Sequence, residues 1–168
     1  LNTLSVDTSF NYVFSDNTYH TFGVGYSLKE YQVTNSSTAS NSIKKSEGDS
    51  VSFKISNDLT RNTLNSYIKP STGNFISFVN LIETPSSSDN GFIKNILSGK
   101  KYYSMNQNIF SAQAKVGNIF SLNDSEILSD NKFSLGGRWL RGFDAYGVGP
   151  RNSRNSYVGG NNVIALKL

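Results

Sequence analysis

The stretch Phe22-Gly23-Val24-Gly25-Tyr26-Ser27-Leu28 decides the fold class of this chain. Large apolar and aromatic side chains occupy every second position, and glycine or serine occupies the positions between them. Successive side chains of a β-strand point to opposite faces of the sheet. The period of two therefore predicts a strand with one bulky apolar face and one face of small or polar residues.

The same alternation continues outward from this stretch in both directions. It predicts seven strands, at residues 4–14, 22–29, 51–59, 74–83, 92–103, 110–116 and 162–168. Short turns are expected at 15–17 and 104–107, a further connection at 61–73, and longer polar loops at 34–48 and 85–91. The segment 74–83 has apolar residues on both faces, so the alternation leaves its orientation open. We expect an all-β fold, an antiparallel meander of about seven strands.

Composition narrows the class of protein. The chain has 168 residues, of which 36% are hydrophobic, 12% aromatic and 17% charged. No apolar run approaches the roughly 18 residues that a membrane-spanning helix needs. The absence of cysteine excludes disulfides and thiolate metal sites. The net charge of +4 comes without a cluster of lysines or arginines, so nucleic acid is not expected as a partner.

Strand length and loop order distinguish two all-β architectures. Strands of about ten residues can cross a bilayer at a tilt, and short turns that alternate with long loops are typical of transmembrane barrels. We therefore expect a transmembrane β-barrel with outer-membrane lipids around it. A soluble, carbohydrate-binding β-sandwich is the alternative. The polar strand residues expected to line a wet lumen are Asp7, Asn11, Lys29, Lys54, Asn80, Gln113 and Lys115.

One connection is much longer than the others and rich in glycine. It spans about residues 119–161 and contains Phe133-Ser-Leu-Gly136-Gly137-Arg-Trp139-Leu-Arg141-Gly142-Phe143. Hairpin loops usually have about 2–5 residues, so a loop of this length and composition is expected to fold and to carry function. Glycine permits tight reversals that other residues avoid. The expected loop-shaping residues are Gly136, Gly137, Gly149, Pro150, Gly159 and Gly160, with Trp139 as a candidate packing anchor.

The glycine-rich segment resembles a known loop. Its motif is Phe133-x-Leu135-Gly136-Gly137-x3-Arg141-Gly142-Phe143, followed by Gly149-Pro150-Arg151 and Gly159-Gly160-Asn161. This motif is similar to the sixth extracellular loop of BamA-type outer-membrane assembly proteins, which belong to the bacterial surface antigen superfamily. Further matching segments are Thr60-Arg61-Asn62, Lys69-Pro70-Ser71-Thr72-Gly73 and Lys101-Tyr102-Tyr103-Ser104. The resemblance is strong from Val51 onward and departs at Thr63, Leu64 and Asn65, where the family commonly has acidic residues.

The resemblance implies an architecture and a role for the loop. Residues 1–168 would form one partial barrel domain, near the seventh to thirteenth strands of a sixteen-stranded barrel, without the periplasmic repeats and the barrel ends. The loop would fold back into the lumen and dock Arg141, Gly142 and Phe143 on the inner wall. The planar guanidinium of Arg141 can form paired hydrogen bonds with a carboxylate. The acidic partners that the family implies would lie beyond Leu168.

The implied function is assembly of outer-membrane proteins. Members of this family fold and insert β-barrel proteins into the bacterial outer membrane through a lateral seam. The implied partners are unfolded barrel substrates and accessory periplasmic lipoproteins. A protein-translocating pore of the same superfamily, for two-partner secretion or autotransporter assembly, is the alternative. Enzymatic activity, a metal site and a cofactor are not expected, because His20 is the only histidine and the carboxylates are dispersed.

Overall fold

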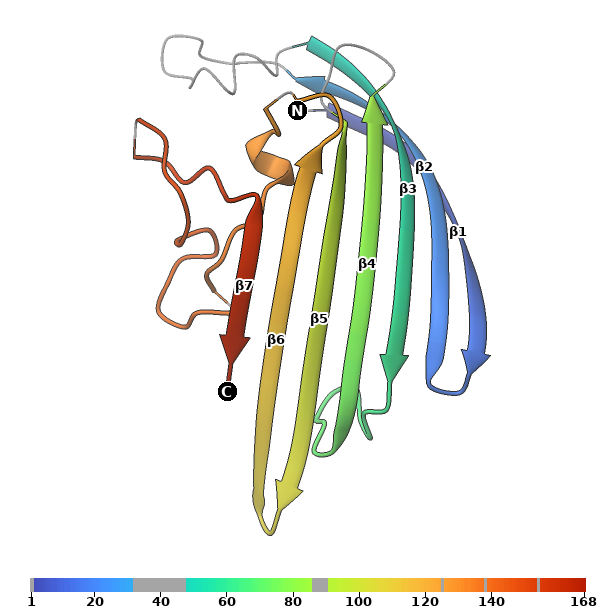
Figure 1. The fold of residues 1–168 in the computed structure, drawn as a ribbon, viewed down its shortest axis with the longest axis vertical. Coiled ribbons are helices and arrows are strands. Elements are labelled where there is room, and N and C mark those ends of the chain that lie inside the picture. The colour runs from blue at the N-terminus through green and yellow to red at the C-terminus, as the bar shows by residue number, and fades with distance from the viewer. Residues whose placement is uncertain (1, 32–47, 86–90, 125, 138, 154) are drawn as a thin grey trace.

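The chain folds into one antiparallel sheet whose strands follow one another in chain order (Figure 1). The computed structural model describes residues 2–31, 48–85, 91–124, 126–137, 139–153 and 155–168. The polar loops expected at residues 34–48 and 85–91 lie almost entirely outside these ranges. The strands are β1 (Asn2–Ser15), β2 (Thr18–Tyr31), β3 (Gly48–Asn62), β4 (Gly73–Pro85), β5 (Phe92–Met105), β6 (Asn108–Ser121) and β7 (Asn162–Lys167). The predicted all-β meander of seven strands is confirmed.

The sheet is a single curved layer, not a pair of packed sheets as in a sandwich (Figure 1). Strands β1 to β6 have 13 to 15 residues each. At a rise of about 3.3 Å per residue, these strands extend about 45 Å. A short 3₁₀ helix, η1 (Ser129–Asn131), lies in the connection between β6 and β7. Within the described ranges, no helical segment has the length and apolar character that a membrane crossing requires.

Cross-strand register sorts the strand side chains into two faces. Residues directly opposite each other on neighbouring strands point to the same side of the sheet. We call the face that contacts the long loop between β6 and β7 the inner face, and the opposite one the outer face. The buried strand side chains all lie on the inner face: Ser27, Ser52, Thr60, Ser77, Glu83, Phe92, Ile119 and Val163.

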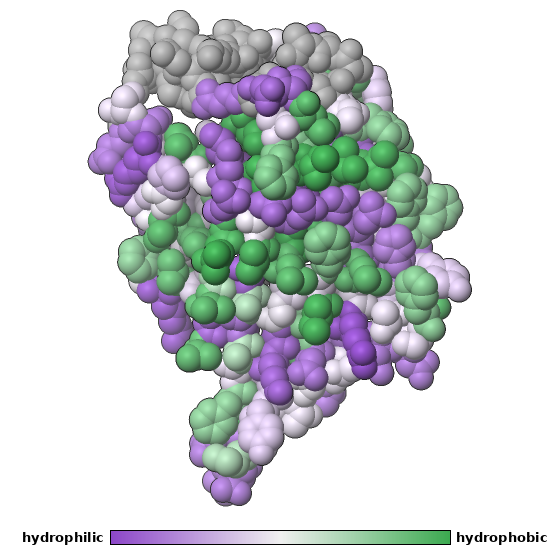
Figure 2. Space-filling view, viewed as in Figure 1, coloured by the Kyte–Doolittle hydropathy of each residue, from purple (hydrophilic) through white to green (hydrophobic). Residues whose placement is uncertain are grey.

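The outer face is covered by exposed apolar side chains (Figure 2). On this face, aromatic and branched aliphatic residues occur on every strand. The larger ones include Val6, Phe10, Phe22, Tyr26, Phe53, Leu59, Ile76, Phe78, Leu97, Val116, Phe120, Ile164 and Leu166. An apolar outward-facing band is typical of the lipid-facing wall of a transmembrane barrel.

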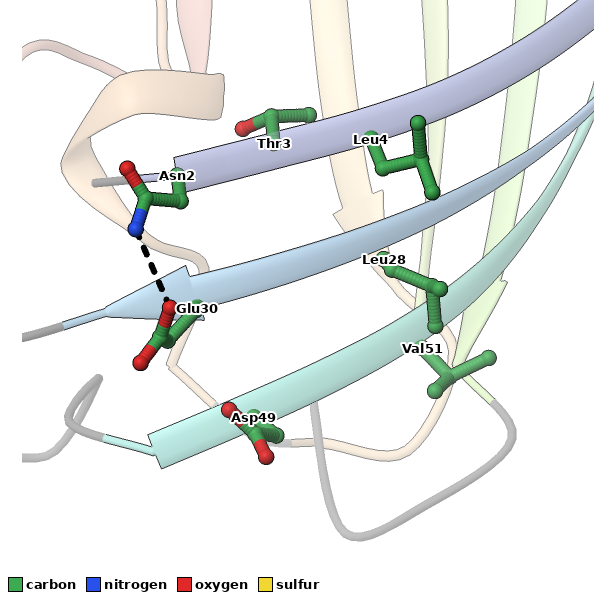
Figure 3. A pocket seen from close by; sticks show the side chains of 7 residues that line it. All are labelled: Asn2, Thr3, Leu4, Leu28, Glu30, Asp49 and Val51. Carbon is green, nitrogen blue, oxygen red and sulfur yellow. Dashed lines mark hydrogen bonds between the residues drawn. The ribbon is translucent and has the colours of Figure 1, made fainter.

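Acidic residues mark one limit of this apolar band, at the strand ends that the long loops connect. Asp49 of β3 lies opposite Glu30 of β2. The amide of Asn2 on β1 donates a hydrogen bond of 3.1 Å to the Glu30 carboxylate (Figure 3). The next row of the outer face is already apolar, and it consists of Leu4, Leu28 and Val51.

Basic residues end the band near the short turns. Arg61 of β3 and Lys101 of β5 lie on the outer face there. Asp49 and Arg61 are twelve residues apart on β3, which corresponds to about 40 Å along the strand. With a strand tilt of about 35–45°, that length spans about 30 Å along the membrane normal, which is the thickness of a bilayer's hydrocarbon core. The spacing of the two charged ends therefore fits a strand that crosses a membrane.

A row of five asparagines crosses the apolar band of the outer face. Asn57, Asn80, Asn95, Asn118 and Asn162 lie opposite one another on β3 to β7. The Asn80 amide donates a hydrogen bond of 2.7 Å to Asn95, and the Asn95 amide donates one of 3.0 Å to Asn118. Figure 2 shows a hydrophilic band between two hydrophobic ones on this face. We call these five residues the asparagine row.

The position of Asn80 corrects the prediction that this residue lines the lumen. Strand β4 has apolar residues on both faces, with Phe78 and Ile82 outside and Val79 and Leu81 inside, so alternation alone does not orient it. The register with β3 and β5 decides the orientation and places Asn80 outside. The side chain of Lys29 lies outside the described residues. The other predicted lumen residues lie on the inner face: Asp7, Asn11, Lys54, Gln113 and Lys115.

The turn between β3 and β4 is ordered around one amide side chain. The side-chain oxygen of Asn65 accepts backbone N–H hydrogen bonds from Ser71 and Thr72, at 3.0 and 3.1 Å. Its amide nitrogen donates to the Ser71 hydroxyl at 2.8 Å. Asn65 is one of the positions at which the sequence departs from the family pattern. An acceptor oxygen is thus present there without the negative charge of an acidic residue.

Candidate functional site: the long loop on the inner face

The candidate site is the long loop, residues 122–161, which connects β6 to β7. The loop begins three residues later than expected, because β6 continues to Ser121 and pairs there with Phe92 of β5. Figure 1 shows the loop folded back alongside β7 instead of extending away from the sheet. Its position relative to the sheet is set by a small apolar core.

This core joins the loop to the inner face. Sheet and loop both contribute buried apolar side chains, which are Phe92, Ile119 and Val163 from the sheet and Ile127 and Phe133 from the loop. Partly buried residues packed against them are Leu81, Ile96 and Leu135. Because the core contains residues of both parts, it forms only while the loop lies on the inner face.

Phe133 is the central contact between the loop and the wall. Its ring lies over Gly117 of β6, where a Cβ atom would come within 2.7 Å of a ring carbon. The Lys94 and Lys115 ammonium groups lie 4.6 and 5.9 Å from the ring centroid. Such cation–π contacts contribute about 0.5–2 kcal/mol each. The Lys94 ammonium also donates a 2.7 Å hydrogen bond to the backbone carbonyl of Asn131 in η1, so the same lysine contacts two residues of the loop.

Three isolated backbone bridges order the loop, and two of them connect its earlier part to its later part. The paired residues are Phe133 with Gly160, Leu135 with Val148, and Arg151 with Tyr157. At the first bridge, Phe133 and Gly160 exchange two N–H···O hydrogen bonds of 2.9 and 2.8 Å. We call residues 127–135 and 157–161 the loop base, and residues 136–147 the loop tip.

Glycine shapes the transition from the base to the tip. Gly136 has a φ of +147°, and a Cβ atom there would overlap the backbone carbonyl oxygen of Asp144. Any other residue at position 136 would therefore displace part of the tip. The other predicted loop-shaping residues lie at turns or bridges of the loop: Gly137, Gly149 and Gly159 have positive φ, Gly160 pairs with Phe133, and the Pro150 carbonyl accepts a hydrogen bond from Val158.

The loop tip presents Arg141, Gly142 and Phe143 together at the surface. All three are exposed, and 55% of the Phe143 surface is accessible. Gly142 has a φ of +88°, and the Phe143 N–H bonds to the Leu140 carbonyl at 3.3 Å to close the turn. Arg141 has no ion-pair partner within the described ranges. Trp139, the candidate anchor, is half-buried at the start of this turn. The docking of Arg141, Gly142 and Phe143 on a wall stays a prediction.

Two residues that sequence reasoning left without a role are structural. Phe133 anchors the loop base, as described above. The Arg151 guanidinium lies 4.0 Å from the centroid of the Tyr157 ring, donates to the Asn155 side-chain oxygen at 2.9 Å, and hydrogen-bonds to the Tyr157 hydroxyl. The sequence signal for both residues was their place in the glycine-rich motif. Phe133 is its first residue, and Arg151 follows Gly149-Pro150.

Within the described ranges, no group of three or more His, Asp or Glu side chains is placed to hold a metal ion. His20, the single histidine of the chain, lies on the outer face of β2 between Tyr12 and Leu59 of the neighbouring strands. Its surroundings are those of a wall residue.

Comparison with known proteins identifies the family. The model of the Omp85 superfamily domain matches residues 1–168. The chain is 30% identical over 138 residues to a SAM50-like protein of Schizosaccharomyces pombe, which covers 77% of this chain and 28% of that protein. It is 26% identical over 155 residues to the outer membrane protein assembly factor BamA of Nitratidesulfovibrio vulgaris, which covers 89% of this chain and 20% of that protein. The chain thus spans less than a third of the length of these relatives.

These matches agree with the sheet and the loop. They confirm the resemblance to BamA-type proteins that the loop motif indicated, and they place the protein in an outer membrane, as predicted. The apolar outer face is what the lipid-facing wall of a transmembrane barrel requires. Because the family model matches residues 1–168 of the chain, the chain belongs to the Omp85 superfamily, a family of outer-membrane β-barrel assembly proteins.

Proposed function

We propose that the protein containing this chain folds and inserts β-barrel proteins into the bacterial outer membrane through a lateral seam of its own barrel. The observation that carries this proposal is the long loop, whose base is packed on the inner face through Phe133 and whose tip presents Arg141, Gly142 and Phe143. A wall that holds such a loop inside its lumen is a fixed scaffold. The moving seam would then lie elsewhere in the barrel.

The proposed mechanism needs no covalent chemistry, nucleotide, metal or cofactor. A substrate strand adds to an exposed strand edge at the seam by backbone hydrogen bonding. In the bilayer every backbone polar group must be paired, so each strand that joins a growing sheet lowers the free energy of the substrate. Burial of the lipid-facing apolar side chains of the substrate adds to this driving force. The partners we propose are unfolded barrel proteins, accessory periplasmic lipoproteins and the surrounding lipids.

The tip of the loop has a positioning role in this proposal. Arg141 is the exposed cation at the turn, with Phe143 two residues away. A guanidinium can hold a carboxylate of the wall by two parallel hydrogen bonds, and the Phe143 ring can cover the apolar surface next to it. Loop base and docked tip would then connect two separate parts of the wall and hold the lumen side of the barrel rigid.

Reconstitution of the intact protein into lipid vesicles tests the proposed function. An unfolded outer-membrane barrel protein is added, and its folding is followed by its heat-dependent shift on gels and by protease protection. We expect folding several times faster than in vesicles without the protein. Equal folding rates in both, together with passage of an exported partner protein into the vesicles, would instead establish the translocating pore.

Substitution of Arg141 tests the role of the tip. In the intact protein, Arg141→Ala should lower the temperature at which the barrel unfolds on gels and impair growth of a complemented strain, because it removes the docking cation. Arg141→Lys should recover only part of the loss, because an ammonium cannot form the paired hydrogen bonds. Arg61→Ala, an exposed arginine of the outer face, is the charge-matched control. Wild-type unfolding and growth with Arg141→Ala would refute docking.

A further inference from the structure

The outer face has an apolar trough near its short-turn end. Ile76, Gly99, Ala114 and Leu166 lie opposite one another on β4 to β7. Gly99 and Ala114 form the floor of this trough, and the larger side chains of Ile76 and Leu166 form its two sides. A Cβ atom at Gly99 would meet no heavy atom within 4 Å, so the space above it is open. The hollow has a volume of about 400 Å³.

Three lysines border this trough, and register places Lys101 on the outer face and Lys100 and Lys167 on the inner face. Lys101 is in the next row toward the short turns, opposite Asn74 and Ala112, and it is exposed. The next row of the outer face toward the short turns holds Tyr103 and Phe110, directly opposite each other. Aromatic residues at this level of a barrel mark the interface between hydrocarbon and headgroups. Lys101 therefore lies where the headgroups begin.

The charges of the outer face are sorted by end. Acidic side chains, Glu30 and Asp49, stand at the end near the long loops. Basic side chains, Arg61 and Lys101, stand at the end near the short turns. Between these two ends, the described outer-face residues carry no charge other than the ionisable His20. The short-turn end is thus complementary to lipid phosphates, whereas the loop end repels them.

We propose that the trough and Lys101 bind one anionic glycerophospholipid in the leaflet at the short-turn end. One acyl chain lies in the trough between Ile76 and Leu166, over Gly99 and Ala114, and the lipid phosphate pairs with the Lys101 ammonium. The aliphatic stem of a lysine lies along apolar surface while its ammonium reaches the headgroups, which suits this position. The family match places the protein in an outer membrane, so lipid surrounds this face.

Photo-crosslinking tests the headgroup contact. The intact protein is placed in phosphatidylcholine vesicles with a minor fraction of phosphatidylglycerol that carries a photoreactive acyl chain, and labelled peptides are mapped by mass spectrometry. We expect labelling of β5 and β6 around Gly99 and Ala114. Lys101→Ala should lower the labelling of these strands about fivefold, which corresponds to the attraction of one basic residue to an anionic lipid surface. Lys100→Ala is the matched control, because that lysine lies on the inner face, 5.4 Å from the Phe75 ring centroid.

Filling the trough tests the acyl-chain contact. Gly99→Leu puts a large side chain into the open space and should abolish labelling at this site, with the barrel still folded as judged by its heat-dependent shift on gels. Thr84→Leu, at the other end of the outer face, is the control for added bulk and should leave labelling unchanged. Equal labelling of the Lys101→Ala and Lys100→Ala proteins, or labelling that persists in Gly99→Leu, would overturn the proposal.

Discussion

The two faces of the sheet satisfy their polar groups in different ways. On the inner face, Lys94 bonds to the backbone of the loop and shares the Phe133 ring with Lys115. On the outer face, the central members of the asparagine row bond to each other. These inner contacts join the sheet to the long loop, whereas the outer ones join neighbouring strands of the sheet. Neighbouring strands are also bonded on the inner face, as between the hydroxyls of Ser27 and Ser52 at 2.7 Å.

The difference follows from what each face meets. A bilayer offers no donors or acceptors at the depth of its hydrocarbon, so a polar side chain on the outer face is costly unless a neighbour on the same sheet pairs with it. The inner face faces a polar lumen and a loop of its own chain, so its contacts are free to be irregular. On the outer face, asparagines of neighbouring strands pair with each other. On the inner face, Lys94 and Lys115 contact the loop.

The largest expected effect breaks the inner contact. In the intact protein, Phe133→Ala should lower the free energy of unfolding by about 3–5 kcal/mol, because it removes a buried aromatic ring and leaves a cavity. The matched control is Tyr146→Ala at the tip, where 70% of the surface is exposed against 6% for Phe133. Urea titration in lipid vesicles measures both. Equal losses for the two variants would mean that the loop base is not the anchor.

A pair of glycines compares the two faces directly. Gly117→Ala on the inner face should destabilise by about 1–3 kcal/mol, because its Cβ atom would press on the Phe133 ring. Gly99→Ala on the outer face meets open space and should be neutral or stabilise by up to about 1 kcal/mol, since alanine restricts the unfolded chain. The same titration reports the difference, and a Gly117→Ala protein as stable as Gly99→Ala would contradict the packing described for the ring.

The smallest expected effect concerns the asparagine row. Asn95→Leu should cost about 1 kcal/mol, because it leaves the Asn80 amide and the Asn118 oxygen without their partner. The triple change of Asn80, Asn95 and Asn118 to leucine should recover that loss, because no unpaired polar group remains among them. Urea titration in lipid vesicles measures the free energy of unfolding of the single and the triple variant. A triple variant less stable than Asn95→Leu alone would show that the row is held by more than its internal hydrogen bonds.

Most of the fold was predictable because the sequence signals for β-strands lie within short stretches of the chain. The alternation around Val24 and Tyr26 depends only on the pleat of a strand, and the polar turns depend on residue type. The family of the loop followed from its motif, because the glycines that the backbone requires are close together in the sequence. The roles of Gly117 and Phe133 could not be predicted, because their contact joins residues sixteen positions apart on different elements.

The sequence by itself determined the all-β class, the number of strands and the place of the long loop, because each of these depends on local periodicity and on turn-forming residues. Only the tertiary structure decided which face Asn80 occupies and where the loop rests. The fourth strand is apolar on both sides, so its orientation comes from hydrogen-bond register with β3 and β5. The loop rests where the Phe133 ring lies over Gly117, with the ammonium groups of Lys94 and Lys115 near the ring. That site exists only once β5 and β6 are paired.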